Sequence, residues 1–375
     1  MIYFDNGASS YPKPPIMLKA MGDWMYRNGA NAGRSGHRLS MEAAELVYNT
    51  RVAIGKLFGV KQAESVVLVP NATYALNTVL LGLFEKGDHI ITTDLEHNSV
   101  VRPLWHLQKS GVEVSVVAVD FEDDEKTLEN MMRAVRRNTK AIICTQCSNI
   151  CGRILPIERI ARRKPSSVLL IVDGSQGAGT LPINVTECGI DYYCAPSHKG
   201  LLGPQGGGVI LVNNQAPRPL IFGGTGTDTM NPEQPDELPD HLESGTLPTP
   251  ICAGMLAAAE YIDSVGQERI AAHKQLLTNY AYECLRNVPN IELYMMPYFE
   301  QCIGVVPFNI SGYSSGDVAA YLDQKEVCVR GGLHCAPLFH RRMGTAERGM
   351  VRISFGYFNT KREIEILTKY LQKIR

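Results

Sequence analysis

The chain has 375 residues, with 37 Lys or Arg and 38 Asp or Glu, so its net charge is -1. This length is enough for two domains. The charges are evenly mixed, without a basic arm that would bind nucleic acid. The sequence also has no apolar run of the roughly 18 residues that span a bilayer. The first five residues lack the parts of a secretion signal, and ten cysteines scattered through the chain favour reduced thiols, so we expect a cytoplasmic protein.

Short apolar runs alternate with helical patterns through the first two-thirds of the chain. Because most of these runs are apolar on both faces, we expect a mostly parallel sheet covered by helices on both sides. Ligands bind beyond the carboxyl ends of such strands, where Asn71, His97, Asn149 and Asp173 fall. The predicted strands are 65–69, 89–93, 112–119, 141–145, 168–172, 192–194 and 209–212, and the predicted helices are 41–58, 73–84, 101–109 and 128–137.

The remaining third of the chain differs in composition and periodicity. Residues 213–250 are rich in Pro, Gly and Asp and show little periodicity, which favours functional loops or a subunit contact. We expect a large α/β domain at 15–250 and a small α+β domain at 251–375, joined by the N-terminal segment 1–14. The pattern after residue 250 predicts helices over 251–287, 315–324 and 360–373 and strands over 303–310 and 351–355.

A lysine beside a glycine-rich loop is the first candidate for chemistry. Residues 195–208 read APSHKGLLGPQGGG, which places Lys199 just after an apolar strand and next to His198. Burial lowers the pKa of an ammonium group and makes the amine nucleophilic, whereas an ordinary surface lysine in a turn is the alternative. His97, Asp173 at a strand end and Gln176 are its candidate partners.

This set, in its order and spacing, resembles the class V branch of the fold type I pyridoxal-phosphate (PLP) enzymes, most closely the cysteine desulfurases and selenocysteine lyases. The resemblance runs nearly end to end, from residues 4–9 to residues 352–354. It implies a PLP-dependent transferase of fold type I, PLP carried on Lys199, and a homodimer.

The resemblance also assigns the cofactor contacts. Asp173 would keep the ring nitrogen protonated, and His97 would stack on the ring. The phosphate would lie at a helix start, with Thr246 reaching it from the partner subunit. Where relatives carry a hydroxyl two residues before the histidine, this chain has Pro196. The cofactor-binding residues implied are Ala72, Thr73, His97, Asn149, Asp173, Gln176, His198, Lys199 and Thr246.

A second stretch, RGGLHCAP at 330–337, contains Cys335. It resembles the Arg-x-Gly-His-His-Cys-Ala loop in which the desulfurase cysteine takes sulfur as a persulfide. Such a thiolate needs a mobile, partly exposed loop with nearby positive charge or a base, which Arg330 and His334 would help to provide. Leu333 replaces the first histidine of the family pair. A buried apolar cysteine is the alternative, and it fits most of the other cysteines.

Substrate binding is expected at an arginine in the last strand. A guanidinium binds a carboxylate through two hydrogen bonds, and the resemblance gives Arg352 this role, a structural ion pair being the alternative. It also places His37 at the active-site entrance, with Asn31 and Arg34 in the same segment, and Asn149 near the substrate. Cys144 and Cys147 lack a second pair at metal-binding spacing, so no metal site is expected.

The sequence therefore predicts a PLP-dependent cysteine desulfurase that releases alanine from L-cysteine. Lys199, Cys335 and His97 would be catalytic, and a persulfide on Cys335 would pass to a sulfur-acceptor protein. The alternatives are a selenocysteine lyase, a C–S lyase, an epimerase or an aminotransferase of the same class, and a non-catalytic protein of the same fold. A nicotinamide enzyme is disfavoured because no G-x-G-x-x-G follows the first strand.

Overall fold

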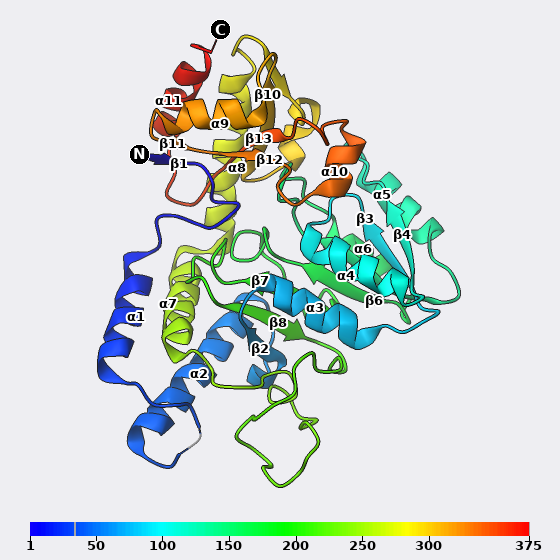
Figure 1. Cartoon of the computed structure of the whole chain (residues 1–375), viewed down its shortest axis with the longest axis vertical. Coiled ribbons are helices and arrows are strands. Elements are labelled where there is room, and N and C mark those ends of the chain that lie inside the picture. The colour runs from blue at the N-terminus through cyan, green and yellow to red at the C-terminus, as the bar shows by residue number, and fades with distance from the viewer. Residues whose placement is uncertain (34, 375) are drawn as a thin grey trace.

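A seven-stranded sheet forms the centre of the computed structural model, which describes residues 1–33 and 35–374 (Figure 1). From β7 to β4 neighbouring strands are parallel, and β8 is antiparallel to both of its neighbours. The predicted mostly parallel sheet is therefore confirmed. Its strands, in spatial order, are β2 (Val66–Val69), β8 (Gly208–Val212), β7 (Tyr192–Pro196), β6 (Leu169–Asp173), β5 (Thr139–Thr145), β3 (His89–Thr93) and β4 (Glu113–Val117).

Helices cover both faces of this sheet because alternate residues of each strand enter different cores. In β5, Ile142 packs into one core and Ile143 into the other. The core that contains Ile143 is covered by α3 (Ala72–Leu83) and α4 (Asn98–Lys109). The core that contains Ile142 is covered by α2 (Arg38–Leu57), α5 (Asp124–Arg133), α6 (Ile157–Arg163) and α7 (Thr249–Val265).

A second, four-stranded antiparallel sheet lies toward the C-terminal end of the chain, at the top of Figure 1. The N-terminus joins this region, since β1 (Ile2–Tyr3) pairs in parallel with β11 (Val327–Cys328). The sheet is ordered β12 (Arg330–Gly332), β13 (Met350–Ser354), β10 (Val305–Ile310) and β9 (Ile291–Leu293), and its helices are α8 (Gln267–Leu285), α9 (Ser315–Asp323), α10 (Pro337–Arg342) and α11 (Lys361–Leu371).

The helical stretch predicted over 251–287 consists of two helices, α7 and α8. They are separated by Gly266, whose φ of 88° belongs to the left-handed region that glycine adopts readily. α7 packs against α2 and α1 (Pro15–Arg27), beside the large sheet, whereas α8 packs against α11 and β10. The predicted division at residue 250 falls at the start of α7.

Most predicted elements are present, with shifts at their ends. The helix predicted at 128–137 is α5 and begins earlier, because Asp123 caps its first turn by accepting a hydrogen bond from the Glu125 amide. The irregular segment between β8 and α7 has no helix or strand, as expected. Within residues 1–33 and 35–374 no helix combines the length and the hydropathy needed to cross a membrane.

Candidate active site

The predicted lysine lies where four parallel strands end. Lys199 follows β7, Asp173 is the last residue of β6, Asn149 follows β5 and His97 follows β3. Because the carboxyl ends of parallel strands meet at one edge of the sheet, the topology brings these side chains together.

Lys199 has the electrostatic properties expected of a nucleophilic amine. Burial lowers its pKa to about 8, a shift that the Asp173 carboxylate opposes and that Arg352 and Arg330 reinforce. Roughly a tenth of the amine is therefore unprotonated at pH 7, far more than for a lysine of ordinary pKa. Cys335 also acts on this pKa, which places the predicted sulfur-accepting thiol in the same neighbourhood.

His97 is a neutral ring at the start of α4. Burial and the charge of Lys199 lower its pKa to about 4. Its Nδ1 accepts a hydrogen bond from the Ser99 amide at 3.0 Å, so the proton of the neutral ring lies on Nε2. The Ser99 hydroxyl also lies 2.8 Å from the Thr73 hydroxyl, which links the starts of α3 and α4. A neutral, fixed imidazole is suited to stacking on an aromatic ring.

The start of α3 and the neighbouring His198 fit an anionic group. Asn71 caps α3, and Ala72 and Thr73 form its first turn, where backbone amides and the helix dipole favour negative charge. His198 Nδ1 is buried and has no hydrogen-bond partner within the described chain. The His198 carbonyl is held by the Lys13 ammonium at 2.7 Å, so this histidine is fixed in place.

Gly208, the first residue of β8, allows close packing against this helix start. A Cβ on Gly208 would lie 3.1 Å from the Asn71 Cα and 2.9 Å from the Ala195 carbonyl oxygen. The Ser197 hydroxyl, a candidate replacement for the one missing at Pro196, lies 2.9 Å from the Gly207 carbonyl and is directed into the same loop. It is therefore not free to bind a phosphate.

Asp173 fits a cationic ring nitrogen. Its side chain is only 2% exposed, and its Oδ1 accepts a hydrogen bond from the Ser175 amide at 2.9 Å. A buried carboxylate is costly unless a cation accompanies it, and the protonated ring nitrogen of PLP would be such a cation. Gln176, three residues later, donates to the Gly7 carbonyl at 2.9 Å and so ties the N-terminal segment to the site.

Cys335 lies in a short turn between β12 and α10. It lines a cavity of about 410 Å³ together with Thr73, His97 and Ser99. The neighbouring His334 is buried, and burial together with the charge of Arg352 lowers its pKa to about 3. Burial thus favours a neutral His334 ring, so Arg330 carries the positive charge of the predicted pair, and a role for His334 as a base beside the thiol stays a prediction.

Arg352 is fully buried in β13 and already has partners. Its Nη2 donates to Asp5 Oδ1 at 2.6 Å, and its Nη1 donates to the Asn149 carbonyl at 2.9 Å, while Nε has no partner among the residues that the structure describes. Gly7 packs against the guanidinium, because a Cβ there would lie 3.1 Å from Cζ. The ion pair proposed as the alternative is thus present, and a substrate carboxylate would have to compete with Asp5.

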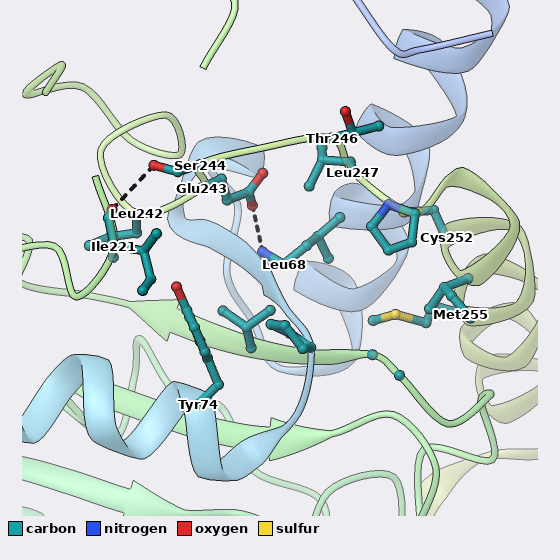
Figure 2. A pocket seen from close by; sticks show the side chains of 16 residues that line it. Leu68, Tyr74, Ile221, Leu242, Glu243, Ser244, Thr246, Leu247, Cys252 and Met255 are labelled. Carbon is teal, nitrogen blue, oxygen red and sulfur yellow. Dashed lines mark hydrogen bonds between the residues drawn. The ribbon is translucent and has the colours of Figure 1, made fainter. Parts of the chain in front are cut away.

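Two predicted residues lie elsewhere in the single chain. His37 is an exposed N-cap of α2, which Figure 1 places at the opposite end of the view from β13. Thr246 lies at a separate cavity of about 280 Å³, with Leu68, Tyr74 and Glu243 among its lining (Figure 2). Arg34 lies outside the described residues.

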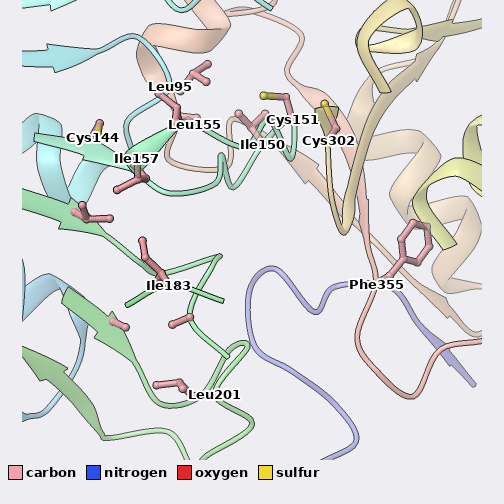
Figure 3. Packing of buried hydrophobic residues seen from close by; sticks show 14 of the residues in the cluster. Leu95, Cys144, Ile150, Cys151, Leu155, Ile157, Ile183, Leu201, Cys302 and Phe355 are labelled. Atoms are coloured by element: carbon pink, nitrogen blue, oxygen red, sulfur yellow. The ribbon is translucent and has the colours of Figure 1, made fainter. Parts of the chain in front are cut away.

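Most other cysteines pack in the core. Figure 3 shows Cys144, Cys151 and Cys302 among other buried side chains of the hydrophobic core. Burial raises the pKa of Cys151 to about 11 and that of Cys147 to about 12, so these thiols stay protonated. Their chemistry is that of small apolar side chains.

Several residues of the site were not predicted. Asp5 and Ser99 hold Arg352 and His97, and Lys13 holds His198. Glu96 is fully buried, and its Oε1 accepts hydrogen bonds from the Thr93 hydroxyl at 2.5 Å and the Thr145 amide at 3.1 Å. Asp5 stands inside the stretch 4–9 that carries the resemblance, and Glu96 directly precedes His97, so their place next to recognised residues was the available signal.

Comparison with known proteins shows the family of the chain. The model of the aminotransferase class-V family matches residues 2–367. A probable cysteine desulfurase of Methanothermobacter thermautotrophicus is 31% identical, covering 100% of this chain and 94% of that protein. The apo structure of a cysteine desulfurase from Thermococcus onnurineus NA1 matches with a TM-score of 0.91 at 30% identity, over 100% of this chain and 94% of that one.

A solved structure of a C-DES mutant with glycine covalently linked to PLP shares the fold, with a TM-score of 0.82 at 21% identity, over 99% of this chain and 96% of the other. Its likeness extends the fold comparison to a protein that contains the expected cofactor. On the family match and these full-length relatives, the chain belongs to the class-V aminotransferase family.

Proposed function

We propose that this chain is a PLP-dependent cysteine desulfurase, which releases alanine from L-cysteine and takes the sulfur as a persulfide on Cys335. One observation carries the proposal: Lys199, whose pKa is lowered to about 8, lies within electrostatic reach of Asp173, Arg352 and Cys335. An amine, a buried carboxylate, a carboxylate-binding cation and a thiol are thus gathered around one site. The cysteine desulfurases among its relatives support the same activity.

The residues present fit PLP. Bound PLP supplies an electron-withdrawing ring that stabilises negative charge on the substrate. Asp173 would face the ring nitrogen, and His97 would lie on the ring face. Thr73 and His198 Nδ1, which is buried without a hydrogen-bond partner in the described chain, would bind the phosphate at the start of α3. Asn149 and Gln176 complete the expected set.

Lys199 would carry the cofactor and move the proton of the substrate's α-carbon. With a pKa near 8 the amine is a competent base near neutral pH, since catalytic efficiency is greatest when the pKa lies near the operating pH. Arg352 would orient the substrate through its carboxylate, in competition with Asp5.

Cys335 would perform the sulfur transfer. Its thiolate attacks the substrate sulfur, so a new S–S bond forms as the C–S bond of the substrate breaks. The electron pair of that bond remains on the β-carbon, which is protonated to give alanine. The terminal sulfur of the resulting persulfide is then available to an acceptor thiol.

The test is incubation of the purified enzyme with L-cysteine, measuring alanine and sulfide with and without added thiol. Replacing Cys335 with alanine removes a nucleophile, so alanine formation should fall by orders of magnitude while PLP absorbance persists. Cys188→Ala is the matched control, a partly exposed cysteine outside the site. Wild-type alanine release from Cys335→Ala would favour a lyase or an aminotransferase instead.

Three further parts belong to this proposal. The active form would be a homodimer with Thr246 reaching the partner's phosphate site, and the persulfide would pass to an acceptor protein. A cytoplasmic location is supported by ten cysteines that are all unpaired. The working division would be a cofactor domain at 15–250 and a small domain at 251–375.

A further inference from the structure

The turn that carries Cys335 has a strained backbone. We call residues 333–336, between β12 and α10, the cysteine loop. His334 and Cys335 have φ values of 48° and 55°, so two consecutive non-glycine residues occupy the left-handed region. Side chains rarely adopt this conformation because Cβ approaches the following carbonyl, and it persists only where surrounding contacts hold it.

The contacts that hold the loop come from the other side of the site. The His334 carbonyl accepts a hydrogen bond from Asn149 Nδ2 at 2.7 Å, and the Cys335 carbonyl accepts one from the Asn98 amide at 2.8 Å. Both carbonyls of the strained pair are therefore fixed by groups that follow strands of the large sheet. Asn98 is also the residue next to His97.

A second attachment lies at the far end of α10, the short helix that follows the loop. Arg342 Nη1 donates to Asp94 Oδ2 at 2.8 Å and to the Val119 carbonyl at 2.7 Å. The guanidinium lies 3.9 Å from the centre of the Phe121 ring. Asp94 is itself fixed, because its Oδ1 accepts from the Val119 amide. Figure 1 shows α10 beside the ends of β3 and β4.

Residues 94–98 thus hold the segment 335–342 at both ends, through Asp94 at one end and Asn98 at the other. The Asp94 side chain is 10% exposed and the Arg342 side chain 31%, so this ion pair is partly shielded from solvent and is weakened less by salt than a fully exposed pair. The His97 side chain projects from the same short stretch. Any movement of α10 away from it would shift Cys335 relative to His97.

From this arrangement we propose that Arg342 is a positioning residue: its ion pair with Asp94 keeps Cys335 at the active site against the strain of the cysteine loop. The role in sulfur uptake rests on the proposed function, in which Cys335 is the accepting thiol. The role in holding the loop does not, and it can be measured without substrate.

The experiment compares Arg342→Met with Arg341→Met in the PLP-loaded enzyme. Arg341 is the exposed neighbour on the same helix and serves as the matched control. Iodoacetamide labelling of the peptide containing Cys335 is followed by mass spectrometry, without substrate. Labelling of Cys144, which is 0% exposed, reports any general loosening of the fold.

Arg342→Met should raise the labelling rate of Cys335 by roughly three- to tenfold, because the loop samples positions farther from the site. Cys144 should stay unlabelled, and the single-turnover rate of alanine release should fall by a similar factor. Asp94→Asn should reproduce the effect, the double variant should add little to it, and Arg342→Lys should restore part of it.

Equal Cys335 labelling in the Arg342→Met and Arg341→Met proteins would overturn the proposal, as would a parallel rise at Cys144. If Arg342→Met does not fold, Asp94→Asn and Arg342→Lys provide the same comparison. Should Cys335→Ala still release alanine, the desulfurase function fails, but the labelling result continues to decide whether the ion pair positions the loop.

Discussion

Lys199 and Asp173 are the charges around which the proposed active site is organised, and both stand at strand ends that the sequence pattern identifies. Their partners were harder to predict. Asp5 pairs with Arg352 across 347 positions of the chain, and no local pattern reports such a contact. The need for a glycine at position 7 is equally invisible in the local sequence, because it comes from the Arg352 guanidinium that packs against Gly7. The neutrality of His334 follows from its burial, which becomes visible only in the folded chain.

Arg352→Lys should lower kcat/KM for L-cysteine by roughly tenfold or more, because an ammonium cannot reproduce the planar fork of a guanidinium. Steady-state kinetics measures this, and cofactor absorbance checks that PLP is retained. Asp5→Asn is the matched control. It removes the competing carboxylate, so it should leave KM unchanged or lower it. Unaltered kcat/KM in Arg352→Lys would exclude carboxylate recognition by this residue.

Glu96→Gln should alter how stability depends on pH. Burial raises the pKa of Glu96 to about 8, and the charges of Asp173 and Asp94 act in the same direction. The folded protein therefore holds this proton while the unfolded chain, with an ordinary pKa near 4.3, has lost it. The stabilisation that this bound proton gives the folded protein is complete below a pH of about 4.3. It decreases as the pH rises from there to about 8, and it does not change further above pH 8.

The variant lacks this titration, so its stability relative to the parent should grow by up to about 1.4 kcal/mol per pH unit within that window. Denaturant unfolding of both proteins at pH 5, 6.5 and 8 measures the difference. A difference that is independent of pH would mean that Glu96 is ionised in the folded protein.

At the scale of elements, most strands of the large sheet could be predicted from the sequence, because a strand that is buried on both faces has a continuous apolar run. α1 was missed for the opposite reason. Its apolar side chains lie on both sides of the helix: Met17 is buried toward α7, whereas Leu18, Met25 and Tyr26 are 59%, 67% and 93% exposed, so the sequence shows no clean apolar stripe. Strands of two or three residues, such as β1 and β12, are too short to show a period. The strained cysteine loop depends on contacts from distant elements and has no local signature.

At the scale of the whole molecule, the site is assembled from both sheets and the N-terminal segment. Phe4 and Asn6 exchange hydrogen bonds with Ser354, and Asp5 binds Arg352, so the first residues join the small sheet to the site. Thr246 lies away from this assembly in a single chain. A symmetric dimer would place it at the partner's site and make the contact twice.

Thr246→Ala should weaken PLP binding modestly, and dilution should release cofactor as dimers dissociate. Sedimentation velocity beside cofactor absorbance measures both effects. Thr229→Ala, an exposed threonine of the same irregular segment, is the control and should behave as the parent. A fully active monomer that retains PLP on dilution would refute the dimeric site.

The central claim is that Cys335 receives the sulfur of L-cysteine. The most direct measurement is mass spectrometry of the PLP-loaded enzyme after one equivalent of L-cysteine, without added thiol. The account predicts that the peptide containing Cys335 gains the mass of one sulfur atom, that the gain is lost on reduction, and that alanine appears in equal amount. Alanine formation with sulfur on another cysteine, or on none, would contradict it.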